Sequence, residues 1–155
     1  MKAYQKIIEQ LEKANIKYTV HTHEEIPTVN LAKEKVQFDI TKCFKTVAFK
    51  YKEKFLFISL LAEDKLKYSK LCSNFKIKRS GLNKADSKEL EEKYGYESGG
   101  MAPISISNDI TVIFDKKINN QDTIFCGSGR RDKTLEIKVN DITNMERVIL
   151  LDISE

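Results

Sequence analysis

The chain has 155 residues, of which 41% are hydrophobic and 32% are charged. This composition excludes an intrinsically disordered protein, and the length suits one domain that buries a real core. Lysine and arginine outnumber aspartate and glutamate by 27 to 23, and the pI near 8.8 indicates a mild bias toward polyanionic partners. We therefore expect a single domain over residues 1–155, without a linker or an internal repeat.

Cysteines and histidines are too few and too scattered for a metal site. Cys43, Cys72 and Cys126 form no CxxC pair, and His21 and His23 are the only histidines. A structural zinc site needs four well-spaced ligands. Met1 leads directly into charged residues, and no run approaches ~18 apolar residues, so we expect no leader and no membrane span. The predicted protein is cytoplasmic and reduced, with no metal and no other cofactor.

Short helices and strands alternate along the chain. Apolar spacing and capping residues predict helices over Lys2–Asn15, Val29–Val36, Lys65–Asn74 after an Asp64 cap, and from an Asp86 cap to Tyr94, with one turn at Asp141–Met145. Alternating and β-branched runs predict strands over Ile16–Thr22, Phe44–Tyr51, Lys54–Leu61, Lys76–Arg79, Ile110–Asp115, Thr123–Cys126, Thr134–Val139 and Val148–Ile153. The order lacks a regular βαβ repeat, which favours an α+β fold with a mixed sheet.

One lysine occupies an unusual position in the predicted sheet. The alternation of strand Phe44–Tyr51 places Lys45 on the same face as Val47, Phe49 and Tyr51. A lysine there either extends to the sheet edge, which is commoner, or serves as a partly buried cation of a functional site. Similarly, His21 and His23 share one face of the first strand, where a solvated or hydrogen-bonded histidine is the ordinary outcome.

Three of the six glycines lie in the ten-residue stretch 94–103, Tyr-Gly-Tyr-Glu-Ser-Gly-Gly-Met-Ala-Pro. Glycine permits positive φ and a close approach of backbone to a ligand, while Pro103 stiffens the far end. Gly95 stands where an αL cap would end the preceding helix. We interpret Gly99 and Gly100 as a cradle of backbone amides.

A second glycine loop, Gly127–Asp132, contains two adjacent arginines, Arg130 and Arg131, which suit phosphate binding. Neither loop fits GxGxxG or GxxxxGK[ST], and no GxSxG, HExxH or kinase motif occurs. Catalysis would therefore rest on amides, a cation and substrate groups. Preorganised amides facing a developing oxyanion are worth on the order of 10²–10³ in rate per donor, enough to promote hydrolysis of an activated ester.

Together these motifs resemble the YbaK/prolyl-tRNA-synthetase-associated domain family. The resemblance is carried by Phe44-Lys45-Thr46, by Gly95-Tyr96 with Gly99-Gly100-x-x-Pro103, and by Gly127-Ser128-Gly129-Arg130-Arg131, with support from Tyr18–Glu24. It spans nearly the whole chain. It implies a twisted, barrel-like mixed sheet flanked by helices, and hydrolysis of aminoacyl esters on mischarged tRNA. The typical substrate is tRNA for proline carrying cysteine, alanine or another small residue, with prolyl-tRNA synthetase as a candidate partner.

The resemblance also assigns roles to individual residues. Lys45 matches the family's essential lysine, which would hold the 3′-terminal adenosine or the carbonyl region, and Gly99 and Gly100 match the loop that contacts the aminoacyl group. The remaining predicted substrate contacts are His23, Thr46, Pro103, Ser128, Gly129, Arg130 and Arg131. Of these, His23 falls where some members carry tyrosine, and Thr46 stands where some subclasses carry asparagine.

The sequence leaves three functional hypotheses. The first is a trans-editing deacylase in which water, the ribose 2′-hydroxyl or a substrate thiol is the nucleophile. The second is a non-catalytic tRNA- or synthetase-binding adaptor, which would keep the arginines but tolerate loss of Lys45. The third, a general single-stranded nucleic-acid module, requires exposed aromatic platforms. Most aromatics instead alternate as strand core, namely Phe49, Phe55, Phe57, Phe114 and Phe125.

Overall fold

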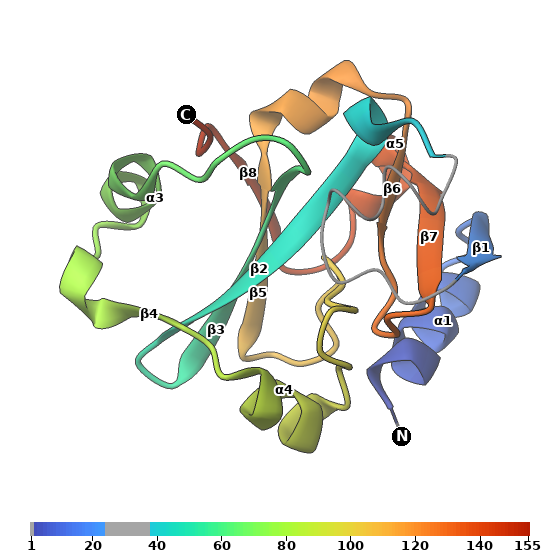
Figure 1. Ribbon diagram of the computed structural model, residues 1–155, viewed down its shortest axis with the longest axis horizontal. Coiled ribbons are helices and arrows are strands. Elements are labelled where there is room, and N and C mark those ends of the chain that lie inside the picture. Colours follow the sequence, from blue (N-terminus) through green and yellow to red (C-terminus); the bar gives the residue numbers. More distant parts are fainter. Residues whose placement is uncertain (1, 24–37) are drawn as a thin grey trace.

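A computed structural model describes residues 2–23 and 38–155 as one curled mixed sheet with short helices around it (Figure 1). The α-helices are α1 (Ala3–Lys13), α3 (Tyr68–Phe75), α4 (Ser87–Tyr94) and α5 (Val139–Ile142), and the 3₁₀ turns are η1 (Ile40–Lys42), η2 (Arg79–Gly81) and η3 (Lys116–Asn120). The strands are β1 (Tyr18–Thr22), β2 (Cys43–Tyr51), β3 (Lys54–Leu61), β4 (Leu82–Lys84), β5 (Ile110–Asp115), β6 (Thr123–Gly127), β7 (Lys133–Lys138) and β8 (Val148–Leu151). The α+β prediction is confirmed.

The strand order is β1-β7-β6-β2-β3-β5-β8, and β4 pairs with β2 beside this path. The β2–β3 hairpin is antiparallel, whereas β3–β5, β5–β8 and β2–β6 are parallel. Apolar side chains of both end strands, β1 and β8, pack against the same core, which also receives the buried face of α1. The sheet thus wraps around one core, in agreement with the predicted barrel-like shape.

The two faces of β2 belong to different cores. Phe44 and Ala48 pack in the main core with β5 and α1, while Val47 and Phe49 pack in a second cluster beneath α3. This is the alternation predicted for strand Phe44–Tyr51. Four of the five aromatics predicted as core are buried, but Phe125 is only partly buried.

The prediction is wrong between residues 64 and 84. Helix α3 begins at Tyr68 rather than Lys65, and its N-cap is Lys67 instead of Asp64. Residues 65–67 instead contact the end of the chain: Leu66 forms a β-bridge with Ser154, and Lys67 N–H donates to Ile153 O. The strand predicted at Lys76–Arg79 lies later in the chain, as β4, where Leu82 is buried against β2.

The cap of the next helix is confirmed. The Asp86 side chain accepts a hydrogen bond from Lys88 N–H, and Gly95 ends α4 with φ of 81°. Glu89 of the same helix forms an ion pair with Lys50 at 3.0 Å. The predicted helix Val29–Val36 lies outside the described residues. Within the described ranges, no helix is long and apolar enough to cross a membrane.

Candidate active site

The sheet opens beside the middle of β2. Strand β2 pairs with β6 only at Cys43 and Phe44, and with β4 only at Phe49–Tyr51. Between these pairings, on the side away from β3, Ala48 O accepts from Ala85 N–H at 2.9 Å as the chain leaves β4. The glycine loop 97–103, which follows α4, lies beside this gap (Figure 1).

A pocket of about 200 Å³ lies between the β2 backbone and the glycine loop. Its lining comes from three parts of the chain: Thr46, Val47 and Ala48 of β2; Lys84, Ala85, Ser87 and Leu90 around the start of α4; and Tyr96, Glu97, Ser98, Gly99 and Met101 of the loop. The structure therefore brings together Thr46 and Gly99, two residues that were predicted as site residues from distant motifs.

Two hydroxyl groups near this pocket have no hydrogen-bond partner among the residues that the structure describes. Thr46 Oγ1 and Ser59 Oγ are both buried from solvent, and the two residues face each other across the β2–β3 ladder. A buried hydroxyl without a partner costs roughly 1–3 kcal/mol. Of the two residues, Thr46 lines the pocket and Ser59 does not.

The structure differs from the predicted cradle of backbone amides at Gly100. Gly100 N–H already donates to Glu97 O at 2.9 Å, and the residue is buried. Its amide is therefore not available to a substrate carbonyl in this structure. By contrast, Gly99 is exposed, has φ of 82°, and lines the pocket together with Met101. Within the part of the chain that is described, neither the Gly99 nor the Met101 amide donates to an acceptor.

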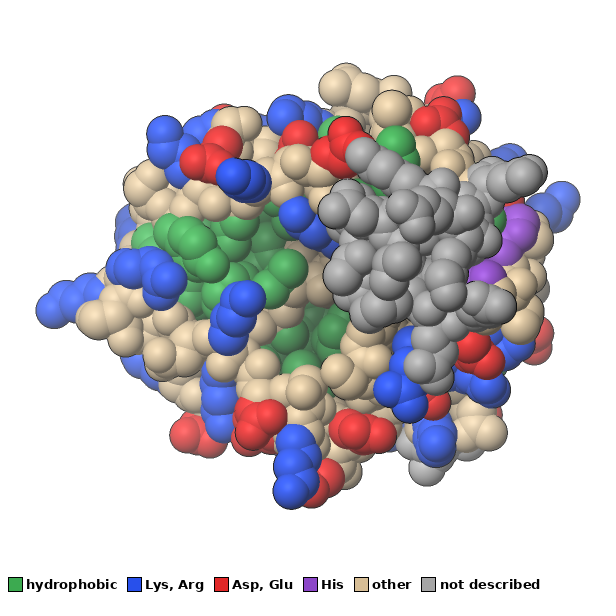
Figure 2. All heavy atoms as spheres, in the orientation of Figure 1, with side chains coloured by type: hydrophobic (Ala, Val, Ile, Leu, Met, Phe, Trp, Pro, Cys, Tyr) green, Lys and Arg blue, Asp and Glu red, His purple; other side chains and the backbone are tan. Residues whose placement is uncertain are grey.

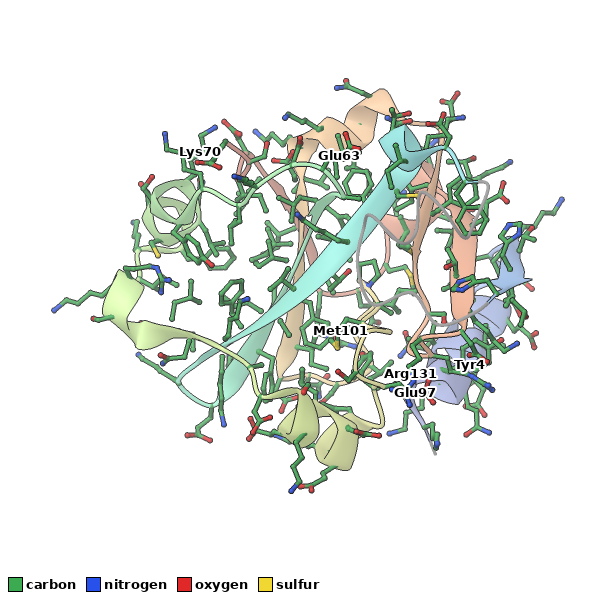
Figure 3. The ribbon with its side chains drawn as sticks, viewed as in Figure 1. Tyr4, Glu63, Lys70, Glu97, Met101 and Arg131 are labelled. Carbon is green, nitrogen blue, oxygen red and sulfur yellow. The ribbon has the colours of Figure 1, made fainter. Side chains whose placement is uncertain are left out.

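Gly100 has a packing role, because the absence of a side chain lets the backbones of the two glycine loops come into contact. A Cβ atom at Gly100 would lie 2.6 Å from the carbonyl carbon of Arg130. Gly129 N–H donates to Gly100 O at 2.7 Å, and Glu97 N–H donates to Gly129 O at 3.0 Å. In Figure 3, Glu97 and Arg131 lie next to each other near Tyr4 of α1, while Met101 lies nearer β2.

Several predicted contacts of the second loop are structural in this geometry. Ser128 is fully buried, and its hydroxyl lies 2.7 Å from Lys133 O and accepts from Arg130 N–H at 3.3 Å. Gly129 has φ of 96° and is packed against the first turn of α1, since a Cβ would lie 2.9 Å from Tyr4 N. In the first glycine loop, the predicted contact Pro103 is also buried.

The arginines of this loop are not equivalent. The Arg130 guanidinium is held by Asp132 through two hydrogen bonds of 3.0 Å, and this contact raises the pKa of Arg130 and lowers that of Asp132. The exposed Arg131 donates its backbone N–H to the Glu97 carboxylate at 3.0 Å. The positive charge of Arg130 is therefore neutralised locally.

Lys45 directly follows the β2–β6 pairing at Phe44, at the β6 end of the same gap, but it does not line the pocket. Its Nζ donates to the backbone carbonyl of Asp64 at 2.5 Å. Burial lowers the Lys45 pKa, the nearby Asp64 opposes this effect, and Lys65 adds to it. Lys45 is therefore a partly desolvated cation, and its role in a functional site stays a prediction.

His23 is held against the neighbouring strand. Its Nε2 lies 2.7 Å from Thr134 Oγ1, and its backbone N–H donates to Asp132 O at 2.9 Å. His21 contacts β7 two residues further along the strand, with Nε2 2.8 Å from Glu136 Oε1. The two histidines therefore share a face, as predicted, and both lie edge-on to Phe38.

Protein thiols are poor candidates for the nucleophile. Burial raises the Cys43 pKa to about 11 and the Cys126 pKa to about 12, so both thiols are protonated near neutral pH. Both are free cysteines. Among the described residues, no three His, Cys, Asp or Glu side chains gather into a potential metal site.

Residues 23–145 match the aminoacyl-tRNA editing domain. The chain belongs to this family. The match includes β2, both glycine loops and every predicted site residue, so the pocket of this editing domain lies wholly within the matched region.

Solved structures show that the fold of this editing domain is shared. The hypothetical protein APE2540 aligns with a TM-score of 0.82 at 17% identity, covering 97% of this chain and 99% of its own. A candidate trans-editing enzyme for prolyl tRNA synthetase aligns with a TM-score of 0.76 at 14% identity, covering 100% and 98%. A scaffold from computational epitope grafting aligns with a TM-score of 0.78 at 13% identity, covering 100% and 98%.

Sequence reasoning did not predict part of the pocket lining of this editing domain. Met101 of the glycine loop and Lys84 at the end of β4 both line the pocket. The Gly-Gly-x-x-Pro spacing points to Gly99 and Gly100, and Met101 is one of the two variable positions between Gly100 and Pro103. Lys84 lies in a stretch rich in lysine, which does not single it out.

Proposed function

We propose that this editing domain hydrolyses the ester bond between a wrongly attached small amino acid and the 3′-terminal ribose of a tRNA. The preferred substrate is tRNA for proline carrying cysteine or alanine, with prolyl-tRNA synthetase as a candidate partner. Family membership supports the editing role, and the structural similarity to a candidate trans-editing enzyme for prolyl tRNA synthetase is compatible with the tRNA.

The observation that carries this proposal is the set of unsatisfied polar groups around one small pocket. The Thr46 hydroxyl, the Gly99 amide and the Met101 amide have no partner among the described residues, and all three residues line it. A pocket of about 200 Å³ is smaller than the ~300–1,000 Å³ that holds a drug-sized ligand. Its size fits an aminoacyl group with a small side chain.

The chemical step would use these groups for electrostatic stabilisation. Attack on the ester carbonyl places negative charge on its oxygen, and backbone amides that are already oriented stabilise that charge without reorganisation. We assign this role to Gly99 with Met101 in place of the originally predicted Gly99 and Gly100. The nucleophile would be water, the ribose 2′-hydroxyl or a substrate thiol.

Lys45 would act as the cation near the reacting end of the tRNA. Its Nζ is anchored on the Asp64 carbonyl, and the ammonium retains two further donors. Partial burial strengthens its interaction with an anion, because less water screens the charge. We propose that Lys45 holds the terminal adenosine or the carbonyl region of the ester.

The need for such an activity follows from the limits of binding selectivity. A synthetase pocket that accepts proline cannot strongly exclude a smaller side chain, since each missing methylene is worth only ~1–3 kcal/mol. A second site that hydrolyses the wrong product removes this error. A small pocket in that second site would exclude the larger, correct residue.

The test is deacylation of tRNA charged with cysteine, alanine, serine or threonine, with the wild-type protein and Lys45→Ala. We expect turnover of at least one small aminoacyl ester by wild type and a loss of at least about tenfold in Lys45→Ala. Lys117→Ala is the matched control, because Lys117 contacts the same Asp64 through its carboxylate at 2.9 Å. It should retain activity.

The outcomes separate the hypotheses. Equal deacylation by wild type and Lys45→Ala would contradict the role of Lys45. Tight binding of uncharged tRNA, with no turnover of any ester in the panel, would favour the non-catalytic adaptor.

A further inference from the structure

A second basic surface lies away from the arginine loop. Residues 65–84 contain seven lysine or arginine residues and no aspartate or glutamate: Lys65, Lys67, Lys70, Lys76, Lys78, Arg79 and Lys84. These residues span α3, η2 and β4, and we refer to residues 65–84 as the basic arm. An equal mixture of signs is the normal pattern of a solvated surface, so a run without any acid indicates a partner of negative charge.

Most of this charge is not neutralised within the protein. Among the described residues, Lys70 is the only cation of the basic arm in an ion pair, with Asp152 at 3.0 Å. The other six are exposed. Arg130, by contrast, already has two hydrogen bonds to Asp132. Six cations of the basic arm therefore have no ion-pair partner among the described residues, whereas Arg130, which was predicted to bind phosphate, already has one.

Arg79 is held in place before any ligand binds. Its guanidinium lies 4.1 Å from the centre of the Tyr68 ring, and Nη1 donates to Leu82 O at 3.0 Å. The side chain is nevertheless exposed, so its remaining N–H groups face solvent. A guanidinium that is already fixed loses less conformational entropy when it binds phosphate.

The basic arm leads to the pocket of the proposed active site. Strand β4 pairs with the end of β2, and Lys84, the last residue of β4, lines the pocket. Figure 2 shows lysine and arginine side chains around an apolar hollow on the side of the molecule where Figure 1 places α3 and β4. Lys70 on α3 lies far from Glu97 and Arg131 in Figure 3. A polyanion along this surface would extend from α3 toward the pocket.

We infer that the basic arm binds the phosphate backbone of the tRNA acceptor end and directs the 3′ terminus into the pocket. This inference rests on the proposed function, because the pocket gives the bound strand its direction. Arg79 and the exposed lysines would contact successive phosphates, and Lys84 would contact the nucleotide nearest the ester.

The first experiment measures binding of uncharged tRNA by fluorescence anisotropy at several salt concentrations. The test variant is Lys67→Ala/Lys78→Ala/Arg79→Ala. The control is Lys13→Ala/Lys17→Ala/Lys138→Ala, which removes the same charge from three exposed lysines on α1, β7 and the α1–β1 connection. We expect the test variant to bind at least about tenfold more weakly and to reduce the slope of log K against log salt by ~2–3, while the control matches wild type.

The second experiment compares hydrolysis of charged tRNA with that of an aminoacyl ester of adenosine alone, which lacks the phosphate backbone. The test variant should lose at least about tenfold more kcat/KM on tRNA than on the small ester. Equal losses on both substrates would contradict the inference, as would unchanged tRNA binding.

Two further outcomes keep this test separate from the proposed function. If wild type hydrolyses no ester but binds tRNA through the basic arm, the proposed function fails and the binding surface stands. Should loss of the Tyr68 contact unfold the triple variant, Lys67→Glu/Lys78→Glu keeps Arg79 and provides the same measurement. Unchanged binding in that variant overturns the inference.

Discussion

The carbonyl oxygen of Met101 lies directly against Gly127, so closely that a Cβ atom at Gly127 would come within 1.8 Å of it. Met101 belongs to the glycine loop that lines the pocket, and Gly127 is the last residue of β6. The position of the pocket loop is therefore set by a strand that lies outside the pocket. The absence of one side chain permits this contact.

Gly127→Ala should therefore displace the pocket loop. No rotamer change relieves a clash between Cβ and a backbone oxygen, so we expect a loss of at least about 2–3 kcal/mol in the free energy of unfolding. Urea denaturation measures this loss. Gly81→Ala is the control, because its Cβ would meet the Tyr51 ring, a side chain that can shift, at 3.0 Å. Equal stabilities for the two variants would contradict the proposed contact.

Ser128→Ala tests whether this buried serine supports the loop or contacts the substrate. Its hydroxyl bonds the backbone at Lys133 O and Arg130 N, so removal leaves buried backbone groups without a partner and should cost roughly 1–3 kcal/mol. Thermal unfolding checks this, with the exposed Ser73→Ala as reference. A Ser128→Ala protein with full stability and reduced deacylation would instead favour the substrate contact predicted from sequence.

Thr46→Val should separate function from stability. The buried hydroxyl has no partner among the described residues, so its replacement by a methyl group should leave the free energy of unfolding unchanged or raise it by about 1 kcal/mol. Loss of one hydrogen bond to the substrate should lower kcat/KM by about tenfold.

Ser59→Ala is the matched control for Thr46→Val. Within the described ranges, the buried hydroxyl of Ser59 also has no partner, but Ser59 does not line the pocket. It should leave kcat/KM unchanged. Full activity in Thr46→Val would exclude a role of its hydroxyl in binding.

Asp109 should make stability depend on pH. Partial burial favours its neutral form, but hydrogen bonds from Ser107, Tyr94 and Lys93 outweigh this effect and lower the pKa from 3.8 to about 2. A carboxylate with a lowered folded pKa stabilises the protein fully above the unfolded pKa, and that contribution is lost as pH falls from about 4 to about 2.

Asp109→Asn should therefore reduce the free energy of unfolding by roughly 1–2 kcal/mol at pH 7, allowing for partial solvent screening. The variant and wild type should converge near pH 2. Chemical denaturation across this range measures the difference. A constant difference from pH 7 to pH 2 would show that the charge of Asp109 is not responsible.

Local patterns predicted those elements whose stabilising contacts are close in sequence. The β2–β3 hairpin and the α4 helix with Asp86 and Gly95 as caps depend on alternation, a short turn and two capping residues, all visible within a few positions. The start of α3 depends instead on a β-bridge from Leu66 to Ser154. No local signal reports a contact across such a sequence separation.

The same distinction between local patterns and distant contacts applies to the candidate site. The sequence by itself determined which residues are candidates for the chemistry, because a glycine pair, a lysine in an apolar register and a threonine beside it can be read from the chain. Only the tertiary structure decided which atoms are available. Gly100 N–H is already bonded to Glu97 O, and Arg130 is already bonded to Asp132, whereas the Thr46 hydroxyl has no partner in the described structure. A hydrogen bond once made cannot serve a ligand as well, and which bonds form depends on the folding of distant segments against each other.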